Sequence, residues 1–140
     1  MICSEIMTKN PKTCLTSDTV MKAAQLMKSE DVGPIPIVDG RDGKKLTGIV
    51  TDRDLALKVV AEARDPKTTQ IEEVMSEGLV TCRENDDVRS VLKLMEQNQL
   101  RRIPVVDKSD HLVGIIAQAD VALRFGETGA TGRVVKEISE

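Results

Sequence analysis

Apolar residues recur at helical spacing in two stretches of the chain. In each stretch they occupy positions i, i+3, i+4 and i+7, which places them on one face of a helix. A segment rich in Ser and Asp or in Asn and Asp precedes each stretch, and such a segment is typical of a helix start. The pattern therefore predicts two amphipathic helices with the apolar faces Val20, Ala23, Ala24 and Met27, and Val88, Val91, Leu92 and Met95.

Short β-branched runs bounded by turn-forming residues predict the strands. Each predicted helix stands between two such runs, and a further helix is expected to begin near Asp52 and again near Gln118. The order strand, helix, strand, strand, helix therefore occurs twice. The expected strands are KTCL (12–15), IPIVD (35–39), LTGIVT (46–51), VTCR (80–83), IPVVD (103–107) and LVGIIA (112–117).

The second half of the chain repeats the first. Residues 6–57 align with residues 74–123, and the two copies share Met7 with Met75 and Cys14 with Cys82. A duplication of this length indicates that both copies fold alike. We therefore predict an α/β (α+β) fold of two β-α-β-β-α units related by a pseudo-twofold axis. The predicted bounds are 4–61 for the first unit, 62–70 for a polar linker, 71–126 for the second unit and 127–140 for a tail that becomes helical near its end.

Charge and composition exclude several classes of partner. The chain carries 20 basic and 23 acidic residues, for a net charge of −3, which offers no long-range attraction to nucleic acid or to a membrane. Phe125 is the single aromatic residue, so the chain lacks a platform for stacking bases. No apolar run reaches membrane-spanning length, and the start MICSEIMTKNP carries an acid where a signal peptide is hydrophobic. We expect a soluble, cytoplasmic protein.

The three cysteines do not form a recognisable metal motif. Cys3, Cys14 and Cys82 lack C-x-x-C spacing, and the chain has one histidine, His111. We therefore expect no metal site, because a standard zinc site would need help from a second chain. The equivalent places of Cys14 and Cys82 favour two buried small apolar residues, and redox sensing is the alternative.

One repeated segment carries candidate binding chemistry. GIVTDRD at 48–54 returns as GIIAQAD at 114–120, with the final acid kept and Thr51 replaced by Ala117. A carboxylate in the first turn of a helix can accept two hydrogen bonds from a ribose diol, which suits Asp54 and Asp120. A phosphate needs donors, which the hydroxyl of Thr51 and the helix N-terminus can supply. Gly48 lacks a side chain and could admit a ligand close to its strand.

These residues also carry a family resemblance. The repeated pattern of IPIVD or IPVVD, a turn, and GIVTDRD or GIIAQAD resembles the cystathionine β-synthase (CBS) domain, and two in tandem resemble a Bateman module. The likeness covers roughly residues 4–125. It implies a non-catalytic regulatory module that senses energy or metabolite state by binding AMP, ADP, ATP or S-adenosylmethionine between the repeats. It also implies a homodimer and no required cofactor, and it leaves the downstream partner unknown.

The resemblance assigns a phosphate role to a basic residue. In similar modules a basic residue at the place of Arg102 reaches the phosphate, and Arg101 precedes it. The first copy has Gly33 and Pro34 at these two places, so guanidinium groups are concentrated in the second copy. Arg101 and Arg102 could instead be solvated residues that protect an edge strand from aggregation.

Three alternative interpretations remain open from the sequence. Thr51 and Asp54 have the spacing of a capping box, in which both side chains serve the helix start rather than a ligand. The module could also be a ligand-free structural or protein-interaction domain. An enzyme acting on nucleotides is disfavoured, because the sequence suggests no general base, nucleophile or metal cluster. The loss of the hydroxyl at Ala117 predicts one competent site and one weaker, differently selective or empty site.

Overall fold

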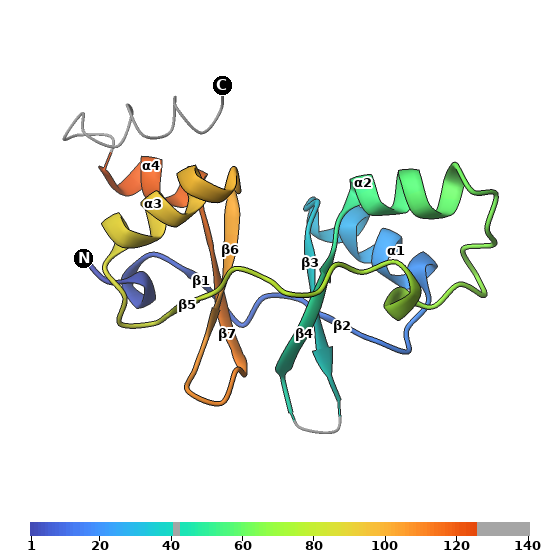
Figure 1. Cartoon of the computed structure of the whole chain (residues 1–140), viewed down its shortest axis with the longest axis horizontal. Coiled ribbons are helices and arrows are strands. Elements are labelled where there is room, and N and C mark those ends of the chain that lie inside the picture. The colour runs from blue at the N-terminus through green and yellow to red at the C-terminus, as the bar shows by residue number, and fades with distance from the viewer. Residues whose placement is uncertain (41–42, 126–140) are drawn as a thin grey trace. The chain divides into compact units, whose positions relative to one another are not determined.

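The computed structural model describes residues 1–40 and 43–125, and its chain divides into two compact units (Figure 1). One unit comprises Lys12–Leu79 and contains Thr51, and we call it the Thr51 unit. The other joins Met1–Pro11 to the chain from Val80 onward and contains Asp120, and we call it the Asp120 unit. The predicted tail, residues 127–140, lies outside the described residues.

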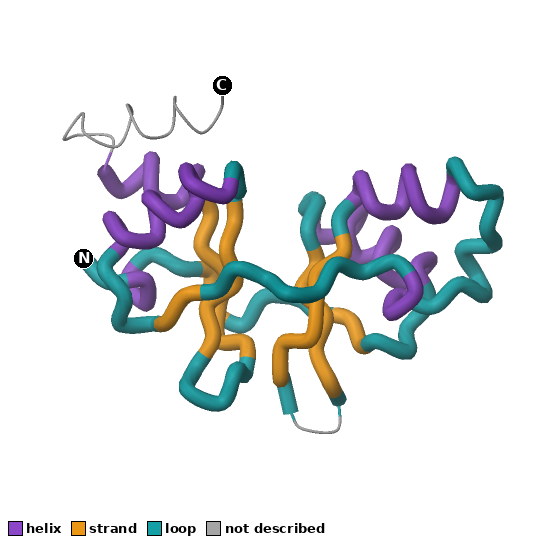
Figure 2. Tube along the Cα trace, viewed as in Figure 1, coloured by secondary structure: helices purple, strands orange, loops and turns teal. Residues whose placement is uncertain are grey.

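The Thr51 unit is built on a three-stranded sheet of order β2-β3-β4. β2 runs parallel to β3, and β3 pairs antiparallel with β4. Figure 2 shows the strands in orange and the helices in purple. Helix α1 provides the crossover between the two parallel strands, as parallel pairing requires. The elements are β2 (Cys14–Leu15), α1 (Val20–Glu30), β3 (Ile35–Asp39), β4 (Lys45–Val50), α2 (Asp52–Leu55), the π-helical continuation η2 (Ala56–Val60) and the 3-10 turn η3 (Ile71–Glu73).

The Asp120 unit repeats this arrangement and adds one strand. Its sheet has the order β1-β7-β6-β5, in which β5 is parallel to β6 and the other pairs are antiparallel. Helices α3 and α4 contact each other and also contact β6 and β7 respectively. The elements are the 3-10 turn η1 (Cys3–Glu5), β1 (Thr8–Lys9), β5 (Cys82–Arg83), α3 (Val88–Asn98), β6 (Arg102–Val106), β7 (Leu112–Ala117) and α4 (Gln118–Phe125). The predicted mixed α and β fold of two repeated units is confirmed.

The beginning of each repeat packs in the unit formed by the other repeat. Strand β1 pairs with β7, so Thr8 lies opposite Ile115. In the Thr51 unit, Ser76 forms the equivalent bridge with Ile49. The bounds of the two compact units therefore differ from the bounds of the sequence repeats, which are 4–61 and 71–126. The stretch 62–70 belongs to the Thr51 unit, where Thr69 is buried and its carbonyl oxygen accepts a hydrogen bond from the Val20 N–H.

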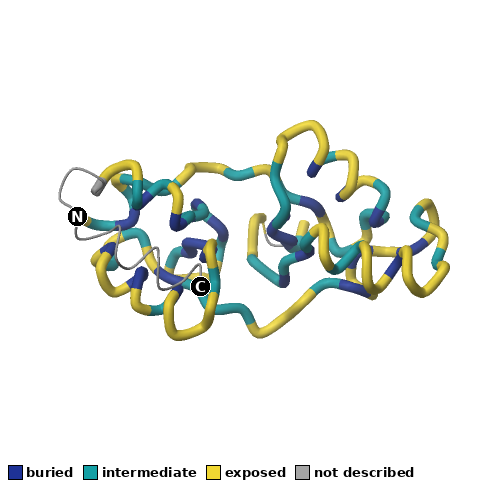
Figure 3. Tube along the Cα trace, turned by 90° about the horizontal axis from the view of Figure 1, so that it is seen from above, coloured by how far each residue is buried: buried dark blue, intermediate teal, exposed yellow. Residues whose placement is uncertain are grey.

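The two predicted amphipathic helices form as expected, and each contributes buried residues to the core of its unit. Figure 3 shows buried positions in dark blue among exposed positions in yellow along the chain. Thr19 caps α1 and Asp87 caps α3, each with a side-chain oxygen that accepts a backbone N–H. All four predicted apolar residues of α3 are buried, whereas Ala24 of α1 is exposed. The methyl group of Ala24 has little apolar area, so its exposure to water costs little free energy. Exposure of the larger side chain of the equivalent Leu92 would cost more.

Within residues 1–40 and 43–125, no helix is both long and apolar enough to cross a membrane.

Candidate functional site

The repeated motif lies where a strand turns into a helix in each unit. In the Thr51 unit, β4 ends at Val50, Thr51 is the N-cap and α2 begins at Asp52. In the Asp120 unit, β7 ends at Ala117 and α4 begins at Gln118. The six predicted ligand residues divide between the two units, with Gly48, Thr51 and Asp54 in one and Arg101, Arg102 and Asp120 in the other.

Thr51 and Asp54 form a reciprocal capping box. The Asp54 N–H donates to Thr51 Oγ1 at 3.1 Å, and the Thr51 N–H donates to Asp54 Oδ2 at 2.9 Å. Both donors would otherwise be unsatisfied at the helix start, because the first turn has no preceding carbonyl groups to bond. The structure thus bears out the capping role that the spacing predicted. A capping role and a ligand role are compatible, because each carboxylate oxygen has two acceptor positions.

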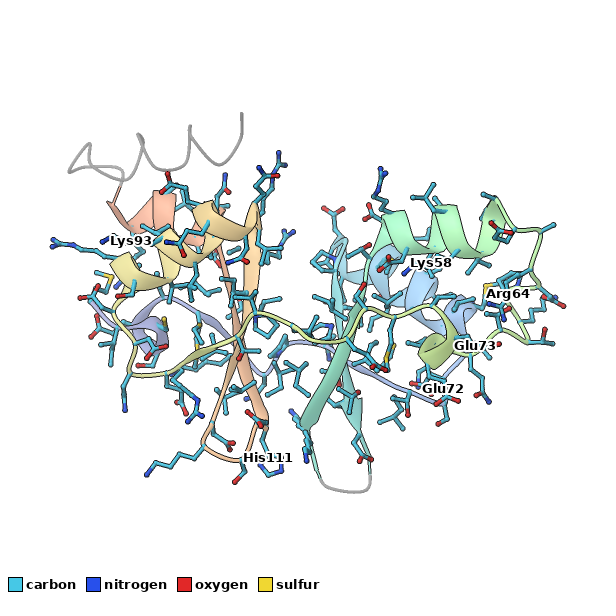
Figure 4. All side chains as sticks on the ribbon, viewed as in Figure 1. Lys58, Arg64, Glu72, Glu73, Lys93 and His111 are labelled. Carbon is cyan, nitrogen blue, oxygen red and sulfur yellow. The ribbon has the colours of Figure 1, made fainter. Side chains whose placement is uncertain are left out.

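The second oxygen of Asp54 faces a lysine that the sequence analysis missed. Lys58 Nζ lies 3.3 Å from Asp54 Oδ1 and donates to the Val74 carbonyl oxygen at 3.0 Å. Figure 4 labels Lys58 on the helix that follows the motif. The spacing i, i+4 on a helix is the signal that could have found this pair. Lys58 therefore connects the motif to the residues that follow η3.

Gly48 has a packing role in this structure. A Cβ built on Gly48 would lie 2.8 Å from Met75 Sδ and 2.8 Å from the Ser76 carbonyl oxygen, so the segment after η3 fills that space. Gly114 repeats the arrangement, because its Cβ would lie 2.6 Å from Met7 Sδ. In both copies, a methionine from the beginning of the other repeat lies against the glycine. This contact leaves no room for a side chain at either position. A ligand role for Gly48 stays a prediction.

The motif in the Asp120 unit lacks the capping hydroxyl and has arginines nearby. Arg102 opens β6 and pairs with Ala117, the residue that replaces Thr51. The Gln118 N–H donates to the Arg101 carbonyl oxygen at 2.8 Å, and Asp120 is half-buried in the first turn of α4. The sheet register therefore brings the two exposed arginines close to the motif of their own unit.

The corresponding place in the Thr51 unit is occupied differently. Gly33 stands where the second repeat has Arg101. A Cβ on Gly33 would lie 3.2 Å from Asp52 Oδ1, so the carboxylate of Asp52 lies beside the glycine. The two motifs consequently differ in local charge, with an acid beside Gly33 in one unit and guanidinium groups in the other.

Two carboxylates with lowered pKa values lie outside the motifs and support turns. The Gln70 N–H and Arg64 lower the pKa of Glu73, and Figure 4 shows Arg64 and Glu73 together. The backbone N–H of His111 is the main cause that lowers the pKa of Asp107, with that of Ser109 contributing. His111 is half-buried, and its Nδ1 lies 3.5 Å from Asp107 Oδ2. These groups stabilise local turns rather than a binding site.

The thiols and the acidic residues provide no metal centre in the part of the chain that the structure describes. Among residues 1–40 and 43–125, no group of three or more His, Cys, Asp and Glu side chains is placed to hold a metal ion. All three cysteines are buried free thiols, which confirms the expectation that Cys14 and Cys82 are core residues.

Comparison with known proteins identifies the family. The family model described as the CBS domain matches residues 3–61 and 71–127. The chain belongs to the CBS-domain family. The Bacillus subtilis (strain 168) protein YlbB is 41% identical to this CBS-domain chain over 136 residues, which are 97% of this chain and 90% of YlbB. Hypoxic response protein 1 of Mycobacterium tuberculosis (strain ATCC 25618 / H37Rv) is 37% identical over 117 residues, which are 82% of this chain and 79% of that protein.

Two solved structures share the fold of this CBS-domain chain. The crystal structure of Hypoxic Response Protein I with two coordinated zinc ions gives a TM-score of 0.79 at 32% identity, covering 88% of this chain and 98% of that one. The CBS domain pair of protein MJ0100, in complex with methylthioadenosine and S-adenosyl-L-methionine, also gives 0.79, at 30% identity and with coverage of 91% and 98%. CBS pairs of this fold therefore include a member that binds adenosine compounds.

Proposed function

We propose that this CBS pair is a non-catalytic regulatory module that binds an adenosine ligand and so senses energy or metabolite state. The ligand class is AMP, ADP, ATP or S-adenosylmethionine. The observation that carries the proposal is the Thr51–Asp54 motif at the start of α2, in a chain similar to a CBS pair that binds S-adenosyl-L-methionine. The carboxylate, hydroxyl and helix start of this motif match the hydrogen-bonding groups of a ribose phosphate.

Five of the six predicted residues have stated roles in the proposed sites, and Gly48 is the exception. Asp54 accepts hydrogen bonds from the ribose diol, and Thr51 with the N-terminal N–H groups of α2 donates to the phosphate. Arg102 supplies charge-assisted bonds to the phosphate, with Arg101 beside it. Asp120 takes the ribose role in the second motif, where Ala117 removes the hydroxyl. The two motifs are therefore expected to differ in affinity.

We also propose a homodimer that covers exposed apolar side chains. Leu57 is 49% exposed and Val60 is 76% exposed on the helix after Thr51, and Leu123 is 82% exposed on α4. Leu57 and Leu123 occupy equivalent positions in the two repeats. Single exposed leucines are ordinary, but an apolar position kept exposed in both copies indicates a shared interface with a second copy. Light scattering at micromolar concentration should give the dimer mass, and a monomer would contradict the interface.

A ligand-free interaction module is the second candidate function. The capping box and Lys58 already bond both oxygens of Asp54, and this arrangement favours a purely structural motif. Heating the protein with AMP, ADP, ATP, S-adenosylmethionine or no ligand separates the two functions. A ligand that binds the folded state raises the melting temperature, by mass action, at concentrations above its dissociation constant. No rise with any of the four compounds would favour the interaction module.

Native mass spectrometry of protein taken directly from cells provides a second test. The proposed function predicts that some chains retain an adenosine compound, and the spectrum also reports the number of chains in the assembly. Incubation of the bound protein with its ligand should give no turnover product, because the module is non-catalytic. A product formed at a steady rate would instead identify an enzyme.

A further inference from the structure

Two buried thiols of the Asp120 unit lie close together, although they are far apart in the sequence. Cys3 Sγ and Cys82 Sγ are separated by 4.0 Å, and the two residues are 0% and 4% exposed. Cys3 belongs to η1 at the N-terminus, whereas Cys82 lies on β5. The proposed adenosine site uses neither residue, so their approach is a separate feature of the molecule.

The backbone fixes the two cysteines beside each other. The Cys3 N–H donates to the Asp86 carbonyl oxygen at 3.0 Å, and the Ser4 N–H donates to the Glu84 carbonyl oxygen at 3.0 Å. The Val88 N–H donates to the Met1 carbonyl oxygen at 2.9 Å. The N-terminal segment is thus bonded along the turn that follows β5, and this bonding keeps Cys3 against Cys82.

The other unit lacks the second thiol at the equivalent place. In the sequence repeat Cys14 matches Cys82, but Ile71 matches Cys3. Cys14 and Ile71 are both buried in the core of the Thr51 unit. The duplicated fold therefore contains one cysteine pair and one Cys–Ile pair in the same architecture, which provides an internal comparison.

We propose that Cys3 and Cys82 form a reversible dithiol–disulfide site that responds to hydrogen peroxide. In the first step the sulfur of Cys3 attacks one peroxide oxygen, the O–O bond breaks, and one water leaves to give a sulfenic acid. In the second step the sulfur of Cys82 attacks the sulfur of Cys3, the S–O bond breaks, and a second water leaves. Two thiols and one hydrogen peroxide thus give one disulfide and two waters, with the thiols oxidised and the peroxide reduced.

The surroundings of the pair favour Cys3 as the first nucleophile. The hydrogen bond from the Cys82 thiol lowers the pKa of Cys3, because it stabilises the thiolate. The same hydrogen bond and then burial raise the pKa of Cys82. The thiolate is the reactive form, so Cys3 reacts with peroxide and Cys82 resolves the sulfenic acid.

Access and closure both depend on the N-terminal segment. Local opening of this short segment, which backbone hydrogen bonds hold in place, lets a molecule as small as peroxide reach the buried sulfurs. The two sulfurs must then approach from 4.0 Å to a bond of about 2 Å. The bond would fasten η1, which contains Cys3, to β5, which contains Cys82, and would close a long loop, which restricts the unfolded chain.

Peptide mapping of the full-length protein after peroxide treatment tests this site. The three cysteines lie in different tryptic peptides, 1–9 for Cys3, 13–22 for Cys14 and 68–83 for Cys82. We expect one cross-linked species that joins peptides 1–9 and 68–83, with the loss of two hydrogen atoms from the intact chain and reversal by dithiothreitol. The oxidised protein should melt about 10 °C higher than the reduced protein, in line with a disulfide that closes a long loop.

Matched variants separate this pair from general thiol oxidation. Cys14→Ala should leave the cross-link unchanged, whereas Cys3→Ala should abolish it. Ile71→Cys should add a second cross-link, to Cys14, because it copies the pair into the Thr51 unit. The proposal is overturned if wild-type peptides 1–9 and 68–83 stay uncrosslinked, if Cys3 proceeds to sulfinic acid, or if Cys14 oxidises as readily as Cys3. Mapping of the wild-type chain decides the question even where a variant fails to fold.

Discussion

Lys58 Nζ lies 3.3 Å from Asp54 Oδ1 and holds the Val74 carbonyl oxygen with the same ammonium group. The carboxylate at the centre of the proposed ribose site therefore has a cationic partner within its own helix. Lys58 is about half exposed, so the pair is worth little to stability. A ribose diol that binds Asp54 Oδ1 must compete with this lysine.

Replacing Lys58 should raise the affinity of the Thr51 unit for adenosine. Lys58→Met keeps most of the side-chain length and removes the competing cation. An exposed i,i+4 ion pair contributes about 0.3–0.5 kcal/mol, so the affinity should rise about twofold. Titration calorimetry with adenosine measures this change.

The chain offers a matched control for that variant. Lys22 Nζ lies 3.3 Å from Asp18 Oδ2, also at i,i+4. Lys22→Met removes an equivalent ion pair away from the motif and should leave adenosine affinity unchanged. An unchanged affinity in Lys58→Met as well would show that Lys58 does not compete with the ligand.

Gly48 should tolerate no side chain while Met75 lies against it. Gly48→Ala would place a methyl group 2.8 Å from Met75 Sδ and from the Ser76 carbonyl oxygen. Overpacking of this kind should lower the free energy of unfolding by about 1–3 kcal/mol, measured by urea denaturation.

Two further variants test the cause of that loss. Met75→Ala alone measures the loss from removing the methionine. In the Met75→Ala chain, Gly48→Ala should cost less than it does in the wild type, and the cost that remains reports the contact with the Ser76 backbone. Gly33→Ala should be nearly neutral, because its nearest neighbour is the exposed side chain of Asp52. Additive losses in the Gly48–Met75 double variant would show that the two residues do not interact.

The repeating elements of this fold could be predicted from the sequence because their signals are local. The spacing of Val88, Val91, Leu92 and Met95 specifies a helix and its buried face without reference to the rest of the chain. The Thr51–Asp54 capping box also follows from spacing alone, because both partners lie within one turn.

The remaining features depend on contacts between distant segments. Nothing in the sequence near Cys3 indicates that it meets Cys82, because their approach requires the N-terminal segment to pack with the second repeat. The beginning of each repeat packs in the unit of the other repeat, which places Met7 against Gly114 and Met75 against Gly48. The packing role of the glycines therefore could not be predicted either. The sequence marked these positions as repeated but did not show what lies against them.

Asp107 should make the stability of the Asp120 unit depend on pH in the acid range. Backbone N–H groups stabilise its carboxylate, so the pKa is lower in the folded state than in the unfolded state. Its contribution is therefore present above the unfolded pKa, about 3.9, and is lost as the pH falls through the folded value. The difference in melting temperature between wild type and Asp107→Asn should be constant near neutrality and shrink below about pH 4. A difference that stays constant below about pH 4 would contradict this role of the Asp107 carboxylate.

Arg102 and Asp120 should affect different parts of the ligand profile. Arg102→Ala should weaken the binding of AMP and ATP more than the binding of adenosine, because the proposed partner of Arg102 is the phosphate. Asp120→Ala should change the affinity of the tightest binding event little, because the motif of Asp120 lacks the hydroxyl at Ala117. Equal losses for AMP and adenosine in Arg102→Ala would contradict the phosphate role.

The most direct test of the proposed function is titration calorimetry of wild type and Asp54→Ala with AMP, ATP, S-adenosylmethionine and adenosine. Loss of the capping box should lower stability by about 1 kcal/mol, which the folded protein tolerates. Loss of the charge-assisted bonds to ribose should cost about 2–4 kcal/mol of binding free energy, which corresponds to about a 30-fold to 1000-fold weaker affinity. If folded Asp54→Ala binds these compounds as tightly as the wild type does, Asp54 serves only as a cap and the ligand assignment is wrong.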